Sequence, residues 1–136
     1  MEKILPQIIK DNCFDFWWDN AKVHALDLPI EKIAVKELDW IFDLPFWSND
    51  GVNYCLKPRD FMKSPQNYPT HMARLTACDT TFPIDIMQNP HGKWLILDGL
   101  HRLVRLVMEG NTTVRVRKLS RDLTSVIRKE KDYAIN

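Results

Sequence analysis

The segment from Asp98 to Arg102 carries the side chains whose types and spacing are best suited to chemistry. It reads Asp-Gly-Leu-His-Arg, so a carboxylate, an imidazole and a guanidinium fall within five consecutive residues. A carboxylate or a neutral imidazole can accept a proton, and a guanidinium can neutralise an anion. At the start of a helix these groups would join free backbone amides and the positive end of the helix dipole. The segment therefore predicts a binding site for phosphate.

The residues on either side of this segment predict a strand followed by a helix. Residues 94–97 form a continuous apolar run, which is typical of a strand buried on both faces. Asp98 is expected to cap the helix, and Gly99 to let the chain turn sharply. The helix should bury the apolar residues that recur at helical spacing, namely Leu100, Leu103, Val104, Val107 and Met108.

The neighbouring turn and strands indicate a mixed sheet. Asn-Pro-His-Gly at 89–92 lies between apolar runs at 82–87 and 93–97, which predicts a β-hairpin. A further strand is expected over 113–119. Because a single short helix connects it to the strand ending at 97, we expect these two strands to be parallel neighbours.

The stretch from Pro83 to Leu119, with the motif at Asp98–Arg102, resembles the core of the ParB/sulfiredoxin-like superfamily. Its members include the nucleotide-binding domain of ParB partition proteins, sulfiredoxin, and free-serine kinases with an Asp-Gly-His-His-Arg signature. The resemblance implies an α+β fold with a small mixed β-sheet flanked by helices. It also implies one domain over 1–136, with a divergent N-terminal part (1–68) and a core (69–136) that carries the motif.

Departures from the family patterns narrow the expected activity. Sulfiredoxin-like enzymes place a catalytic cysteine immediately before the His-Arg pair, and Leu100 stands there, so we reject sulfiredoxin activity. Chromosome partition is not expected. ParB proteins have an arginine-rich Gly-Glu-Arg-Arg type of segment followed by a DNA-reading helix-turn-helix domain, whereas this sequence has Asp-Gly-Leu-His-Arg and lacks that pattern. The serine-kinase pattern is closest at this turn, with Leu100 replacing one histidine. That family takes a glutamate from its N-terminal part as base, and Glu37 is the candidate here.

The motif and the resemblance together assign roles. The expected ligand is a nucleoside triphosphate or diphosphate (ATP, ADP or CTP) or a phosphorylated small molecule, with Mg²⁺, because magnesium binds through carboxylates and phosphate oxygens. The metal ligands are left unassigned. The expected reaction is phosphoryl transfer to a small molecule or nucleotide hydrolysis. The candidate catalytic residues are Asp98, His101 and Glu37, and the candidate phosphate or nucleotide contacts are Asp98, Gly99, Leu100, His101, Arg102 and Arg105.

Three alternatives stay open. Residues 101–136 hold 9 basic and 4 acidic side chains, against 10 and 14 in residues 1–100, so a nucleic-acid-binding or nuclease module is possible. Such a module would need a basic track, for which the candidates are Arg102, Arg105, Arg115, Arg117 and Arg121. A non-enzymatic scaffold would bind protein through the aromatic cluster at 14–18, which more often is core. The simplest alternative is that Asp98 only caps a helix and that Arg102 and Arg105 pair with Glu109 or solvent.

The N-terminal half is less regular. A short helix is expected over 5–12, a strand over 23–28 and a helix over 36–42. Residues 47–69 are rich in turn formers and are expected to be a loop, either a lid or a surface wrap. A helix over 70–78 should bury Met72 and Leu75.

Composition favours a cytoplasmic protein. The chain has 136 residues and a net charge of +1, which suits one domain. Its three cysteines lack a Cys-x-x-Cys spacing, so a reducing compartment is the simpler setting. Neither a signal-peptide core nor an apolar run of about 20 residues is present, so no membrane contact is expected.

Overall fold

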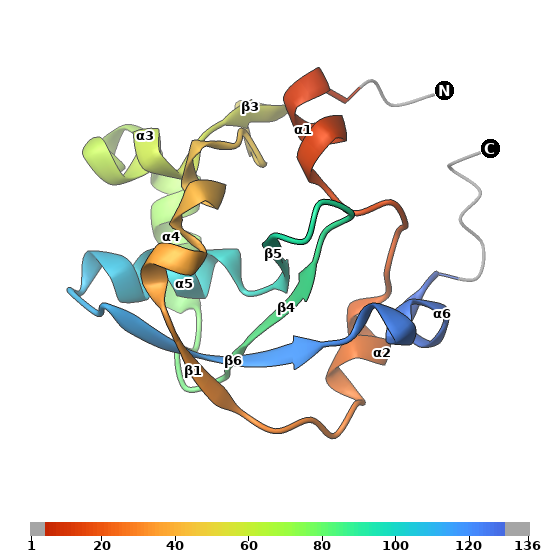
Figure 1. Cartoon of the computed structure of the whole chain (residues 1–136). Helices are drawn as coiled ribbons and strands as arrows, with labels where there is room; N and C mark the ends of the chain where they lie inside the picture. Colours follow the sequence, from red (N-terminus) through yellow and green to blue (C-terminus); the bar gives the residue numbers. More distant parts are fainter. Residues whose placement is uncertain (1–4, 130–136) are drawn as a thin grey trace.

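A four-stranded mixed sheet forms the centre of the protein in the computed structural model, which describes residues 5–129 (Figure 1). The outer strands run antiparallel to their neighbours, and the two central strands are parallel to each other. Helices flank this sheet, so the α+β class is confirmed. In spatial order the strands are β1 (Glu31–Ala34), β6 (Thr113–Leu119), β4 (Ile84–Gln88) and β5 (Trp94–Asp98).

The predicted hairpin is confirmed as β4 and β5. The buried side chain of Asn89 closes the turn, because its Oδ1 accepts hydrogen bonds from the backbone amides of His91 and Lys93. The expected parallel pairing of β5 with β6 is wrong. β5 runs antiparallel to β4, and β6 pairs with the other edge of β4, so β4 separates the two strands that the motif helix connects.

The helices pack around the sheet in small groups. α4 packs against α5, and α2 lies beside α6 (Figure 1). Helix α4 buries Leu75 as expected, but Met72 is 41% exposed and His71 takes the second buried position. In chain order the helices are α1 (Gln7–Asn12), α2 (Asn20–His24), α3 (Pro58–Lys63), α4 (Pro69–Ala77), α5 (Leu100–Met108) and α6 (Thr124–Ile127).

Two predicted elements before residue 47 need correction. The expected strand at 23–28 does not form. The Asp19 side chain caps α2 by accepting from the amide of Ala21, this helix extends to His24, and residues 25–28 lie in neither a helix nor a strand. The expected helix at 36–42 is two 3₁₀ helices, η1 (Val35–Glu37) and η2 (Asp39–Asp43).

The expected loop at 47–69 contains regular structure throughout. Asp50 and Gly51 both have positive φ, at 49° and 80°, as the tight turn of a two-residue hairpin requires. This turn joins β2 (Trp47–Asn49) to β3 (Val52–Leu56). Helix α3 and a 3₁₀ helix, η3 (Pro65–Asn67), fill the rest of the segment.

The aromatic cluster near the N-terminus belongs to the core. Phe14 and Phe16 are buried, and Trp18 packs edge-on against both of them. The strand expected over 113–119 is confirmed as β6, on which Val114 and Val116 are buried. Within residues 5–129, none of the helices is long and apolar enough to cross a membrane.

Candidate functional site

The motif lies at the junction between β5 and α5. Asp98 is the last residue of β5, and Gly99 turns the chain with a φ of 114°. Asp98 was expected to cap α5, and this is wrong: Gly99 occupies the cap position, and no side chain bonds the first turn. The Asp98 carboxylate instead accepts hydrogen bonds from His24 Nε2 at 2.7 Å and Arg102 Nη2 at 3.3 Å. Because Gly99 is the N-cap in place of Asp98, α5 begins one residue later than expected. The Asp98 carboxylate is therefore free to bond His24 and Arg102.

The Arg102 guanidinium lies against the backbone of Gly99. A Cβ atom at position 99 would lie only 2.9 Å from Arg102 Nη2, so any other residue would displace the end of this arginine, and the φ of 114° itself favours glycine. Nη2 also donates to the carbonyl oxygen of Pro83 at 3.3 Å. The Nε of Arg102 is buried and has no hydrogen-bond partner among residues 5–129. Because a buried unpaired donor costs free energy, this atom indicates an acceptor that residues 5–129 do not supply.

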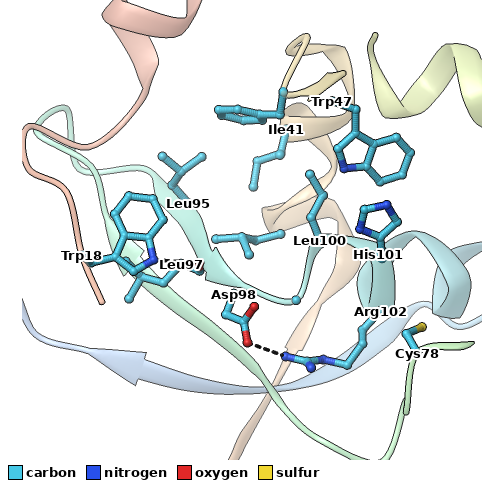
Figure 2. Close-up of a pocket in the computed structure, with 13 residues that line it drawn as sticks. Trp18, Ile41, Trp47, Cys78, Leu95, Leu97, Asp98, Leu100, His101 and Arg102 are labelled. Carbon is cyan, nitrogen blue, oxygen red and sulfur yellow. Dashed lines mark hydrogen bonds and ion pairs between the residues drawn. The ribbon is translucent and has the colours of Figure 1, made fainter. Parts of the chain in front are cut away.

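A cavity of about 370 Å³ opens at this junction and is called the junction cavity below. Figure 2 shows Trp18 on one side of it, Leu100 and His101 on the other, and Asp98 with Arg102 at one end. The Trp18 ring is held in place, since its Nε1 donates to the Leu97 carbonyl at 3.0 Å. The cavity thus combines a fixed aromatic surface with a charged end.

His101 belongs to a stacked group with His71 and Trp47. The Trp47 ring lies over both imidazoles, with centroid distances of 4.5 Å to His71 and 4.4 Å to His101. His71 Nε2 lies 2.6 Å from the Ser48 carbonyl, which can only accept, so this nitrogen carries the proton. In the neutral rings His71 Nδ1 then accepts from His101 Nε2 at 3.1 Å, and His101 Nδ1 remains an acceptor.

This arrangement sets the charge of His101. Burial, with smaller contributions from His71 and Arg74, lowers the pKa of His101 from 6.5 to about 4. The ring is therefore neutral at neutral pH, as a position near the positive end of the α5 dipole favours. With Nε2 donating to His71, the ring has no N–H left for a phosphate.

A second carboxylate stands beside Asp98 in the sheet. Asp85 on β4 is in register with Asp98 on β5 and with Arg117 on β6. Arg117 Nε donates to Asp85 at 2.7 Å, and the two side chains are 12% and 3% exposed. Arg117 also donates to the carbonyls of Val23 and Leu26, which ties this pair to α2. Two Asp–Arg pairs therefore lie next to each other at the end of the sheet.

Three of these side chains have the geometry of a possible metal site. The ligand atoms of His24, Asp85 and Asp98 lie within 4.8 Å of one another. Each carboxylate, however, already pairs with an arginine, Asp85 with Arg117 and Asp98 with Arg102. The charges of the group are thus balanced without an ion, and we assign no resident metal to it.

The structure does not bring two of the predicted site residues to the junction cavity. Glu37 is exposed on η1 and does not line the cavity. Arg105 Nη1 donates to the carbonyls of Leu75, Thr76 and Cys78 at the end of α4, and its Nε bonds Glu109. Arg105 therefore holds α4 against α5.

Sequence reasoning missed His24 as a site residue. His24 lies 74 residues from Asp98 in the chain, at the end of a helix that had been predicted as a strand. The sequence signal that could have identified this helix is Asp19, whose side chain caps it. Asp98, Gly99, Leu100, His101 and Arg102 all line the junction cavity.

Comparisons with known proteins add no assignment. No family model matches the chain, and neither the curated proteins nor the solved structures contain a significant match. The ParB/sulfiredoxin-like resemblance thus depends on the motif and its flanking elements alone.

Proposed function

We propose that this chain binds a nucleotide in the junction cavity, with the phosphates at the start of α5 and the base against Trp18. The observation that carries the proposal is the buried Nε of Arg102, which lacks a hydrogen-bond partner within the described chain. A phosphate oxygen is the acceptor that a guanidinium binds best, since two of its N–H groups can bond one phosphate.

The start of α5 supplies further donors. The first intrahelical bond runs from the Leu103 amide to the Gly99 carbonyl, so the amides of residues 100–102 have no acceptor within the helix. These amides and the dipole of the nine-residue helix favour an anion at this end. Gly99 lets the anion approach, because it has no side chain to cover the backbone.

The rest of the cavity suits the other part of a nucleotide. Its volume of about 370 Å³ is within the range of small-molecule sites, roughly 300 to 1,000 Å³. Trp18, Leu97 and Leu100 give it an aromatic and aliphatic lining, against which a planar base can stack. Magnesium would enter with the nucleotide, and no residue of the chain is assigned to hold it.

The nucleic-acid alternative receives less support. The arginines that were candidates for a basic track each bond an acceptor within the chain. Arg117 pairs with Asp85, and Arg121 pairs with Asp15. Arg115 donates to the Thr81 carbonyl, and Arg105 to the end of α4. Carboxylate partners balance the charges of Arg105, Arg117 and Arg121, which interrupts the predicted basic track, so we do not propose this function.

Thermal unfolding in the presence of ATP, ADP or CTP, each with and without Mg²⁺, tests the proposal. A ligand at 100 times its dissociation constant stabilises the folded state by about 2.7 kcal/mol. We expect at least one nucleotide to raise the melting temperature, and inorganic phosphate to do so less. Equal melting temperatures with and without every nucleotide at millimolar concentration would contradict the proposal.

A further inference from the structure

A second cavity shares Arg102 with the junction cavity and is called the His24 cavity. Its volume is about 610 Å³, and Arg102 lines both cavities. Its apolar part includes two of the chain's exposed large hydrophobic side chains, Ile30 at 51% and Phe82 at 59%. Its polar part contains His24, Asp27, Asp85 and Arg117. Apolar walls with a few converging polar groups are typical of a site for a small molecule.

The His24 imidazole has a fixed tautomer in this cavity. An ionised carboxylate can only accept, so His24 Nε2, at 2.7 Å from Asp98 Oδ2, carries the proton in the neutral ring. This leaves Nδ1 as an acceptor, and it has no partner among residues 5–129. A carboxylate that orients a neutral imidazole, so that the other ring nitrogen can accept a proton, is the arrangement of a general base.

The charges of the His24 cavity differ from those of the junction cavity. Asp85 is neutralised by Arg117, and Arg102 is neutralised by Asp98. Asp27 lines the cavity and forms no ion pair with any described residue. The remaining negative charge disfavours an anionic ligand and favours a neutral or cationic one. The open acceptor on His24 requires that this ligand carry a donor.

We infer that the His24 cavity holds the phosphoryl acceptor, an apolar amino alcohol, and that His24 is its general base. This inference rests on the proposed function, because the nucleotide in the junction cavity would be the donor. The acceptor hydroxyl gives its proton to His24 Nδ1, and its oxygen forms a bond to the terminal phosphorus of the nucleoside triphosphate. The bond from that phosphorus to the bridging oxygen breaks, and the nucleoside diphosphate leaves with the electron pair. Arg102, which lines both cavities, donates hydrogen bonds to the transferred group.

Binding of the acceptor can be measured without nucleotide. The probe is phenylalaninol, an aromatic amino alcohol, titrated into the full chain by NMR. Two relatives of the probe test the recognition: phenethylamine lacks the hydroxymethyl group, and 2-benzyl-3-hydroxypropanoate carries a carboxylate in place of the amine. We expect phenylalaninol to bind and both relatives to bind at least about tenfold more weakly, the factor that corresponds to the loss of a single interaction. Phe82→Ala should weaken binding, and Val52→Ala, an exposed apolar residue on β3, should not.

Turnover tests the role of His24. With ATP and Mg²⁺, phosphorus NMR should detect phosphorylated phenylalaninol with the wild-type chain. His24→Gln keeps a donor for Asp98 but cannot accept the proton, so kcat should fall by about 10² to 10⁴ while KM for the alcohol stays the same. A KM that rises with an unchanged kcat would overturn the general-base role.

The two proposals fail in different ways. Nucleotide binding without any binding of phenylalaninol overturns this inference and leaves the proposed function intact. Binding of phenylalaninol without any binding of nucleotide overturns the proposed function and, with it, the acceptor role. Binding of both, with transfer that depends on His24, supports both proposals.

Discussion

Asp98 and Asp85 stand opposite each other on neighbouring strands, and each is neutralised by a different arginine. Arg102 approaches Asp98 from the helix that follows it, four residues away, whereas Arg117 approaches Asp85 from the next strand of the sheet. The two pairs differ in strength. Arg117 makes short bonds to Asp85 and to α2, while Arg102 makes bonds of 3.3 Å and keeps a buried donor unused. We interpret the first pair as structural and the second as available to a ligand.

This interpretation predicts that Arg117 is the more important for stability. Arg117→Met removes the partner of a carboxylate that is 3% exposed, so the free energy of unfolding should fall by about 3 to 5 kcal/mol. Chemical denaturation measures the loss. Lys118→Met on the same strand is the control, because Lys118 pairs with Glu31 at 3.5 Å and both side chains are more exposed. Its loss should be below about 1 kcal/mol. Equal losses for the two variants would contradict the structural role of Arg117.

Gly99→Ala should weaken nucleotide binding by displacing the end of the Arg102 side chain. The new Cβ would lie 2.9 Å from Nη2, and a φ of 114° strains any residue other than glycine. Gly92→Ala is a matched control, since Gly92 has a φ of 81° and open space around its Cα. Each variant should lose about 1 to 2 kcal/mol of stability from the positive φ. Only Gly99→Ala should also lose nucleotide affinity in calorimetric titration. Wild-type affinity in that variant would show that the position of Arg102 does not matter for binding.

Asp98→Asn tests the correction of the capping role. If Asp98 were a helix cap, asparagine would replace it with little change. Since Asp98 instead bonds His24 and Arg102, the substitution leaves Arg102 without its counter-charge, and we expect a loss of about 1 to 3 kcal/mol in the free energy of unfolding. A double-mutant cycle with His24→Gln should give a non-zero coupling energy. Additive effects of the two substitutions would argue against the His24–Asp98 contact.

The pKa of His101 predicts how stability depends on pH. Between pH 6.5 and about 4 the unfolded chain binds a proton at His101 and the folded chain does not, so stability should fall as the pH falls through this window. After allowance for the partial exposure of the ring, the loss should be on the order of 1 to 2 kcal/mol. Denaturation at several pH values measures it. His101→Gln removes this group alone, so its stability should change less over the same window. An identical pH dependence in both proteins would refute the assignment.

The part of the fold that the sequence predicts best is the region that contains the motif. Local signals, namely turn residues and the spacing of apolar residues, predict three of its elements: the β4–β5 hairpin, the helix after the motif and the strand at 113–119. The pairing of β6 with β4 depends on which edge of the β4–β5 hairpin the chain reaches after α5. No local sequence pattern specifies that edge. Asp50-Gly51 is a clear hairpin signal, but the polar and proline-rich residues around it favour a loop.

The candidate site was predictable only where it is contiguous in the chain. Residues 98–102 lie together because they follow one another at the end of a strand. His24 and Arg117 are separated from their carboxylate partners by 74 and 32 residues, so their pairing depends on the tertiary fold. The sequence suggested that Arg117 belongs to a basic surface. In the structure Arg117 instead forms an ion pair with Asp85.

The most direct test of the account is the affinity of Arg102→Ala for ATP, measured by isothermal titration calorimetry beside the wild type. Arg121→Ala is the control, because it removes the same charge at an exposed pair with Asp15 that does not line the junction cavity. We predict that Arg102→Ala weakens binding by about 1.5 to 3 kcal/mol, the contribution of a charge-assisted hydrogen bond, and that Arg121→Ala has the affinity of the wild type. Folded Arg102→Ala protein that binds ATP as tightly as the wild type would contradict the account.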